Sequence, residues 1–203
     1  MKRGVPWGWV AAGVVGAGVV TWLVVRARRA QASSSTGGSA GPRGGASAGE
    51  NAAQAARREK LMPAFRAAAQ KHGVPLPWLL AIARKETGFA NVRSAPGQRD
   101  DLLGGAWGPM QVTSETARVL GFKPGAALEA RGQAMLSDPA AAIELGAKYL
   151  TRLRGEFGQD LERVAAGYNA GPGRVRSGKI PPATAQRYVP AVVAFARQYA
   201  GIA

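Results

Sequence analysis

One glutamate occupies a position from which its carboxyl group could act as an acid. The chain has no cysteine and one histidine, which excludes thiolate chemistry and leaves little material for a histidine metal site or a Ser/His/Asp triad. Glu86 continues the apolar stripe of Leu79, Ile82 and Ala83 at the spacing of one helix face. A carboxyl group on such a face loses hydration and keeps its proton to a higher pH, as a general acid near neutral pH must. Glu86 is therefore the candidate acid, although a glutamate at the edge of the stripe could also lie in water.

The helices that must position this residue are indicated by proline, aspartate and glycine. Proline in a first turn, an aspartate N-cap and glycine after a last turn are typical helix boundaries. The expected helices, by residue range, are 63–72, 78–87, 139–155 or 139–158, 160–168 and 184–199. No long alternating run of apolar residues predicts a sheet. The expected fold class is all-α, built from residues 57–203.

The region before residue 57 is expected to form a membrane anchor and a tether. Residues 5–25 carry no charge, and as a helix they would extend roughly 31 Å, close to the hydrocarbon thickness of a bilayer. Tryptophans lie near both ends of this segment, where interfacial aromatic residues belong. Residues 1–29 are therefore predicted to be a transmembrane helix, with a cleaved signal peptide as the rival. Residues 30–56, rich in Gly, Ser and Ala, are predicted to be a flexible linker.

Small residues recur at every fourth position near the start of the chain. They are Gly4, Gly8, Ala12 and Gly16. Such a ridge could let two anchors pack closely as a helix–helix dimer. Glycine and alanine are common throughout this chain, and we prefer that simpler explanation.

The charge of the chain indicates an anionic partner. Lys and Arg number 27 against 12 Asp and Glu, which gives a net charge of +15. Nucleic acid is not the expected partner, because aromatic residues do not alternate with the basic ones and no binding motif occurs. The charge instead favours docking onto an anionic wall polymer or lipid headgroups. We interpret the one histidine, His72, as structural, so no metal site is expected.

Several short motifs follow Glu86 in order along the chain. In one-letter code they are ETGF at 86–89, S at 94, GAWGPMQV at 105–112, AGYNAGPGRV at 166–175, PP at 181–182 and YV at 188–189. This ordered set resembles the lytic transglycosylase domain of the soluble-lytic-transglycosylase type, which is related in fold to goose-type lysozymes. The resemblance covers about residues 60–200 and implies a lysozyme-like helical domain.

The resemblance implies an enzyme that cleaves peptidoglycan with one carboxyl group. Glu86 would protonate the oxygen between N-acetylmuramic acid and N-acetylglucosamine. It would then take a proton from the muramic C6 hydroxyl as that group attacks C1, which leaves a 1,6-anhydromuramoyl end. Ordinary glycosidases use two carboxylates. No cofactor is implied, and the domain should lie on the periplasmic or extracytoplasmic side of an inner membrane that its N-terminal helix spans once.

Five residues match the substrate-binding positions of the resembled family. They are Ser94, Met110, Gln111, Tyr168 and Asn169. The hydroxyl of Tyr168 is the expected hydrogen-bond partner of the Glu86 carboxyl group or of the developing charge. Simpler roles are a core position for Met110, a packed aromatic for Tyr168 and a helix cap for Asn169.

The sequence departs from the family pattern at three single positions and in one segment. Pro109, Ala142 and Thr184 stand where leucine, asparagine and glutamate are usual. The segment between Glu86 and Gln111 is longer than expected and contains Asp100 and Asp101. Because goose-type lysozymes carry aspartates that position water at about this distance, a muramidase that hydrolyses the same bond is the main rival hypothesis.

Two further alternatives concern activity and location. A non-catalytic wall-binding module would keep the cleft and lose the acid, whereas Glu86 is present here. A secreted enzyme, or a phage-encoded protein that acts on the host wall, would have the same sequence layout. Exo or endo cleavage and stem-peptide preference do not follow from the sequence.

Overall fold

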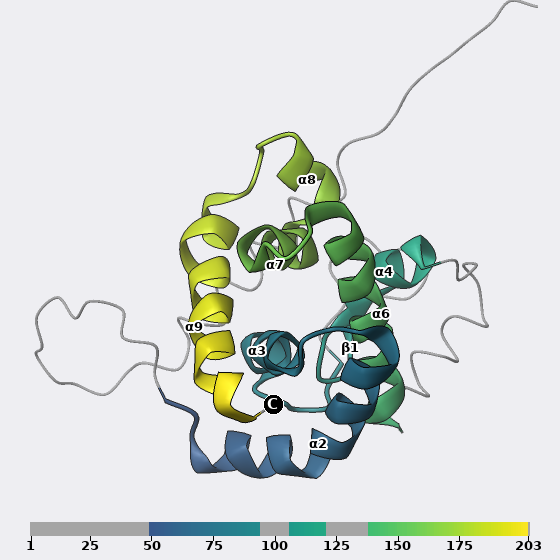
Figure 1. The fold of residues 1–203 in the computed structure, drawn as a ribbon, viewed down its shortest axis with the longest axis vertical. Helices are drawn as coiled ribbons and strands as arrows, with labels where there is room; N and C mark the ends of the chain where they lie inside the picture. Colours follow the sequence, from purple (N-terminus) through teal and green to yellow (C-terminus); the bar gives the residue numbers. More distant parts are fainter. Residues whose placement is uncertain (1–48, 94–105, 121–137, 203) are drawn as a thin grey trace, which may run out of the picture. The chain divides into compact units, whose positions relative to one another are not determined.

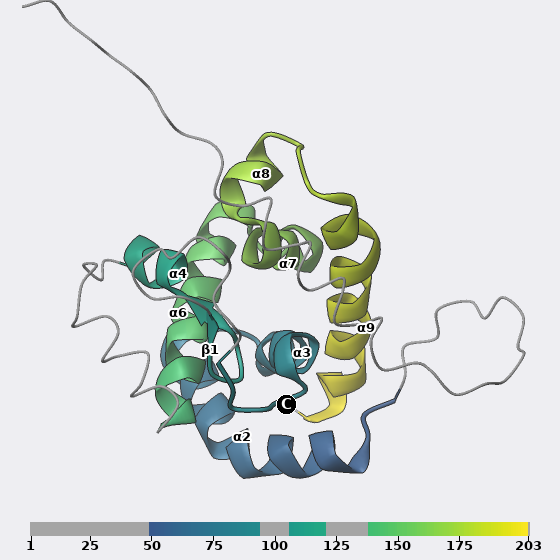
Figure 2. The same cartoon turned by 180° about the vertical axis from the view of Figure 1, so that it is seen from behind.

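Helix α3 (Leu76–Thr87) lies at the centre of the fold and is seen end-on in Figure 1. Its residues 79–83 are completely buried, so neighbours cover the helix on every side. The surrounding helices, also seen from behind in Figure 2, are α2 (Ala52–His72), α6 (Pro139–Phe157), α7 (Leu161–Ala170) and α9 (Val189–Tyr199). These helices therefore surround the helix whose last turn contains the candidate acid.

The computed structural model describes residues 49–93, 106–120 and 138–202. The predicted anchor, most of the predicted linker, Ser94, Asp100 and Asp101 lie outside the described residues. Within the described ranges, no helix combines the length and the apolar character that a bilayer crossing requires.

Helix α2 begins well before the predicted start at Pro63, which lies inside the helix, so that prediction is wrong. The start is set by Asn51, whose side chain accepts a hydrogen bond from the backbone N–H of Gln54 at 2.9 Å. The Gln54 side chain accepts one from the backbone N–H of Asn51 at 3.3 Å, which completes a capping box. The predicted end is confirmed, because Gly73 follows the helix with φ 61°.

The aspartate cap predicted for α6 is confirmed, and α7, which was expected to begin at residue 160, is capped by an aspartate as well. The Asp138 side chain accepts a hydrogen bond from the backbone N–H of Ala140 at 3.0 Å, and the Asp160 side chain accepts one from that of Arg163 at 3.0 Å. Each cap satisfies a backbone donor that has no partner inside its helix. The sequence predicted that α6 ends at residue 155 or 158, and the structure shows that Gly158 follows the last turn.

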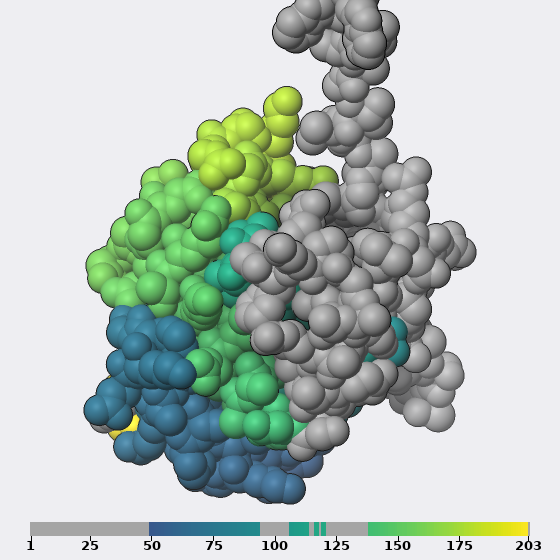
Figure 3. Space-filling model, turned by 90° about the vertical axis from the view of Figure 1, so that its right-hand side faces the viewer, coloured from purple at the N-terminus to yellow at the C-terminus, as the bar shows by residue number. Residues whose placement is uncertain are grey.

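The last predicted helix is divided into two elements. Thr184–Tyr188 form a π-helical turn, η1, in which the N–H of the next residue reaches back to the carbonyl oxygen of Thr184. Helix α9 follows, and a 3₁₀ turn, η2 (Ala200–Ile202), comes after it. The short helix α8 (Pro172–Arg176) precedes η1 and lies at the opposite end of the domain from α2, as the space-filling view also shows (Figures 1 and 3).

The all-α expectation needs one correction. Strands β1 (Ala106–Trp107) and β2 (Val112–Thr113) form a two-stranded antiparallel sheet, which is followed by the short helix α4 (Ser114–Val119). Arg93 adds an isolated bridge to Trp107. Two-residue strands are too short to show the alternation by which a strand is recognised in a sequence.

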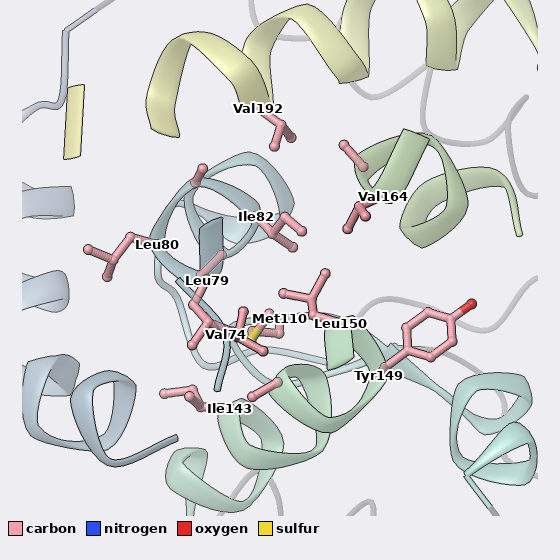
Figure 4. Close-up of a cluster of buried hydrophobic side chains, with 14 of the residues drawn as sticks. Val74, Leu79, Leu80, Ile82, Met110, Ile143, Tyr149, Leu150, Val164 and Val192 are labelled. Atoms are coloured by element: carbon pink, nitrogen blue, oxygen red, sulfur yellow. The ribbon is translucent and has the colours of Figure 1, made fainter. Parts of the chain in front are cut away.

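The core surrounds α3 and is formed with α6, α7, α9 and the loop that joins the two strands (Figure 4). Met110 from this loop is completely buried in it. A Cβ atom added at Gly146 of α6 would lie 2.6 Å from the Met110 sulfur. The loop can therefore pack this closely on α6 only because position 146 has no side chain.

A polar cluster joins the start of α2 to the end of α9. Glu50 accepts hydrogen bonds from Arg58 Nε at 3.2 and 3.1 Å and from the Tyr199 hydroxyl at 2.9 Å. The Arg58 and Glu50 side chains are only 12% and 15% exposed. Burial and the Glu50 hydrogen bond raise the pKa of Tyr199, so its hydroxyl remains a donor. This cluster ties the first described residues to the C-terminal helix.

We expect Glu50→Gln to lower the free energy of unfolding by about 1–2 kcal/mol, because it removes the less exposed of the two carboxylates that bind the poorly hydrated Arg58 guanidinium. The measurement is urea denaturation followed by circular dichroism. Glu59→Gln is the matched control, because Glu59 also contacts Arg58, at 2.6 Å, but is 65% exposed. A solvated pair of this kind contributes little. Equal losses in the two variants would contradict the role given to Glu50.

Candidate active site

Glu86 lies in the last turn of α3, where the helix leaves the core. Gly88 follows the helix with φ 61°, and its N–H donates to the carbonyl oxygens of Ala83 and Arg84. Residues 79–83 are completely buried, whereas Glu86 is partly exposed. Because Glu86 is the last residue of the apolar stripe, its carboxyl group lies at the edge of the core.

Arg84 lies off this stripe and is nevertheless buried, with 5% exposure. Its guanidinium group lies 3.9 Å from the centre of the Phe195 ring, and its Nη1 donates to Gln198 at 2.6 Å. Both partners belong to α9, so Arg84 joins the central helix to the C-terminal one. The hydrogen bond and the ring contact offset the cost of burying this charge.

The side chain that contacts Glu86 is Tyr188. Its hydroxyl donates to Oε1 of Glu86 at 2.6 Å. Tyr188 is the last residue of η1 and is 5% exposed, so its position is set by packing. The Lys85 ammonium group lies 6.0 Å from the centre of its ring. The sequence motif included Tyr188, but its spacing did not indicate this contact.

Tyr168 has a different hydroxyl partner from the one expected. Its hydroxyl donates to the carbonyl oxygen of Met110 at 2.8 Å, and its ring lies 5.5 Å from that of Tyr149. Burial raises the pKa of Tyr168 well above its usual value, and the charge of Glu86 acts in the same direction. Tyr168 therefore stays protonated and ties α7 to the loop beside the acid.

The loop between the strands is held by the amide of Gln111. Its Nε2 donates to the carbonyl oxygens of Gly108 at 3.0 Å, Val92 at 3.1 Å and Ala106 at 3.4 Å. Gln111 itself has φ 50°, an uncommon conformation that these bonds help to maintain. The loop is joined to α3 by Thr87, whose hydroxyl donates to the carbonyl oxygen of Pro109 at 2.9 Å. Gln111 therefore builds the wall beside Glu86.

Two of the other predicted site residues have distinct surroundings in the structure. Met110 lies in the core, where its side chain is completely buried. Asn169, in the last turn of α7, is partly exposed and accepts a hydrogen bond from the Thr184 hydroxyl at 2.7 Å. Ser94 lies outside the described residues. Substrate contacts by these residues remain predictions.

The described side chains form an arrangement that can support proton transfer. One partly exposed carboxyl group meets a tyrosine hydroxyl, with a second tyrosine and an asparagine on the facing helix. In the part of the chain that the structure describes, no group of three His, Cys, Asp or Glu residues could hold a metal ion. A carboxyl group in such surroundings can donate a proton and accept one back.

The transglycosylase SLT domain family matches residues 63–187, which is more than half of the chain. The chain belongs to this family. Glu86, Gln111, Tyr168 and Asn169 all lie within the matched region, so the SLT domain contains the described site. The family resemblance inferred from the motifs is thereby confirmed.

Similar proteins agree with this family assignment. The soluble lytic murein transglycosylase of Salmonella typhimurium is 34% identical over 100 residues, which are 49% of this chain and 14% of that protein. The SLT domain described here is thus similar to a small part of a much longer relative.

Solved structures share the fold. The lytic transglycosylase Slt of Pseudomonas aeruginosa, solved as an inactive mutant, matches 70% of this chain and 24% of its own, with TM-score 0.54 and 27% identity. The 70 kDa soluble lytic transglycosylase of Escherichia coli matches 72% of this chain and 25% of its own, with TM-score 0.54 and 25% identity. These likenesses confirm the expected lysozyme-like helical fold of the SLT domain.

Proposed function

We propose that this SLT domain is a peptidoglycan lytic transglycosylase in which Glu86 acts first as acid and then as base. The observation that carries the proposal is the Glu86 carboxyl group, partly exposed at the end of a buried helix and bonded to the Tyr188 hydroxyl at 2.6 Å. Family membership and the murein transglycosylases similar to this chain support the same activity.

The proposed reaction needs only one carboxyl group. Glu86 gives its proton to the oxygen between N-acetylmuramic acid and N-acetylglucosamine as that oxygen leaves C1 of the muramic residue. The C6 hydroxyl oxygen of the same residue bonds to C1, and its proton passes to the Glu86 carboxylate. The carboxyl group regains its starting state, no water is consumed, and the muramic residue ends as a 1,6-anhydro ring. The Tyr188 hydroxyl stabilises the carboxylate that exists between these two proton transfers.

The substrate-binding residues are proposed to act in two ways. Tyr168 and Asn169, on the partly exposed end of α7, would contact the glycan directly. Met110 and Gln111 would shape the wall beside the acid, since one is packed in the core and the amide nitrogen of the other bonds the backbone. Ser94 is proposed to line the same cleft.

Mass spectrometry of the first products tests the proposal. Purified peptidoglycan incubated with the full chain should yield muropeptides with 1,6-anhydromuramoyl ends. Products heavier by one water molecule, with reducing ends, would instead establish the muramidase that Asp100 or Asp101 would serve. Binding without any product would establish a non-catalytic wall-binding module.

We infer the surroundings of the domain from the N-terminal sequence. Residues 1–29 are proposed to span the inner membrane once, with residues 30–56 as a linker that leaves the SLT domain on the periplasmic side. The full chain should then remain in the membrane pellet after a high-salt wash. A mature protein that begins after residue 29, found in the soluble fraction, would establish a cleaved signal peptide. Secretion or a phage role would fit that second result.

Tyr188→Phe is expected to lower kcat by about tenfold to a hundredfold, which corresponds to the roughly 1.5–3 kcal/mol of a hydrogen bond to a charged group. The ring is kept and only the hydroxyl that holds Glu86 is lost. Tyr199→Phe is the matched control, because it removes another buried tyrosine hydroxyl that donates to a glutamate, Glu50. That control should change thermal stability and leave kcat near the wild-type value. Similar kcat losses in both variants would argue against the positioning role of Tyr188.

A further inference from the structure

The π-helical turn η1 presents two hydroxyl groups to opposite sides of the site. Thr184 and Tyr188, at its two ends, are 1% and 5% exposed, whereas residues 185–187 between them are exposed. The Tyr188 hydroxyl donates to Glu86 on α3, and the Thr184 hydroxyl donates to Asn169 on α7. Single π turns of this kind occur frequently at functional sites. The contact to Glu86 serves the acid, and the contact to Asn169 has no role in the reaction proposed above.

In the structure, the Thr184 hydroxyl bonds the oxygen end of the Asn169 amide. An asparagine side chain has one acceptor, its oxygen, and one donor group, its nitrogen. Thr184 donates to the oxygen at 2.7 Å and is itself buried, so the amide oxygen is turned toward η1. Asn169 is partly exposed, and no described residue bonds its amide nitrogen. The two N–H groups are therefore the part of this side chain that is left for a ligand.

We propose that Thr184 is a specificity-determining positioning residue that holds Asn169 as a hydrogen-bond donor to the acetamido carbonyl oxygen of the glycan. The proposal rests on the function proposed above. A sugar hydroxyl can donate or accept, so it would bind either orientation of the amide. A carbonyl oxygen only accepts, so it is the group that a fixed donor distinguishes. Removing the acceptor leaves a polar group of the site without its partner, which is how such sites discriminate between substrates.

The test compares peptide-free glycan strands that are N-acetylated with strands that have been de-N-acetylated. The ratio of kcat/KM for the two strands is measured with the full chain and with three variants. Thr184→Val keeps the shape of the side chain and loses the hydroxyl, and we expect the ratio to fall about five- to tenfold. Thr184→Ser keeps the hydroxyl, and its ratio should stay within about twofold of wild type.

Asn169→Asp tests the donor itself. An aspartate still accepts from Thr184 but has no N–H group, so kcat/KM for the acetylated strand should fall. The readout for this variant is that value and not the ratio, because the new carboxylate also attracts the amino groups of the de-acetylated strand. The variants at position 184 do not alter charge, so the amino groups of the de-acetylated strand affect all of them equally. Thermal unfolding is followed for each variant to establish that it is folded.

A merely structural role for Thr184 would lower kcat/KM for both strands together and leave their ratio unchanged, and that result would overturn the proposal. Equal ratios for Thr184→Ser and Thr184→Val would overturn it as well. If wild type releases no product from either strand, the proposed function fails separately. The same ratio is then measured as binding of the two strands by calorimetry, and a wild-type preference that Thr184→Val removes would still support the proposal.

Discussion

Glu86→Gln is expected to reduce the release of 1,6-anhydro products by about 10²- to 10⁴-fold, the range that general acid–base catalysis contributes. Glutamine has nearly the same shape and can still accept the Tyr188 hydrogen bond through its amide oxygen. It has no proton to give to the leaving oxygen and cannot take one from the C6 hydroxyl. Binding of glycan strands should therefore change much less than turnover.

The measurement is turnover of purified peptidoglycan with quantified anhydro ends. Glu162→Gln is the matched control, because Glu162 is an exposed glutamate in the first turn of α7. It should leave turnover near the wild-type value. Undiminished release of anhydro ends by Glu86→Gln, in a folded sample, would remove Glu86 from the acid role.

Gly108→Ala is expected to cost about 2–5 kcal/mol of stability, the largest effect we expect from a single methyl group. Gly108 has φ 73°, a conformation that disfavours a side chain by about 1–2 kcal/mol. The added Cβ would lie 2.4 Å from the Cβ of Ala142 on α6, and overpacking of this kind costs about 1–3 kcal/mol. Because the Gly108 carbonyl oxygen accepts from Gln111, the wall beside Glu86 should shift and turnover should fall as well.

A double-mutant cycle separates the two causes. Ala142→Gly removes the methyl group that the new Cβ would meet, but a glycine inside α6 itself costs about 0.5–1 kcal/mol. After the effect of that single variant is subtracted, the double variant should recover the overpacking part and leave the backbone strain. Gly155→Ala is the control, because position 155 lies inside α6 with nothing within 4 Å of an added Cβ. It should be neutral or raise stability by about 0.5–1 kcal/mol. No recovery in the double variant would contradict the assigned contact with Ala142.

Whether a helix boundary could be predicted depended on how close in the sequence its signal lies. Asp138 and Gly73 act on backbone groups within their own turn, so their caps could be predicted from neighbouring residues. Pro63 was misinterpreted as a helix start, because a proline is also tolerated inside a helix whose stability comes from a cap and from packing. The two short strands had too few residues for a pattern.

Within the site, Glu86 could be found from the sequence because the stripe that contains it repeats within one helix. Its partner could not, since Tyr188 lies 102 residues further along the chain and reaches it only through the packing of α9 on α3. The hydrogen bonds from Thr184 to Asn169 and from Tyr168 to Met110 could not be predicted for the same reason. Helical periodicity relates residues three or four positions apart. It does not indicate which residue far along the chain will place its hydroxyl group beside a given side chain.

The sequence by itself determined the candidate acid, its helix, the family and the absence of thiol chemistry. These depend on residue types and on spacing within single elements. The tertiary structure decided which tyrosine bonds the candidate acid, that the Gln111 nitrogen bonds the backbone and that the Asn169 oxygen accepts from Thr184. The physical reason is that one hydroxyl or amide group has few bonding sites, and only the packed neighbours determine how they are used.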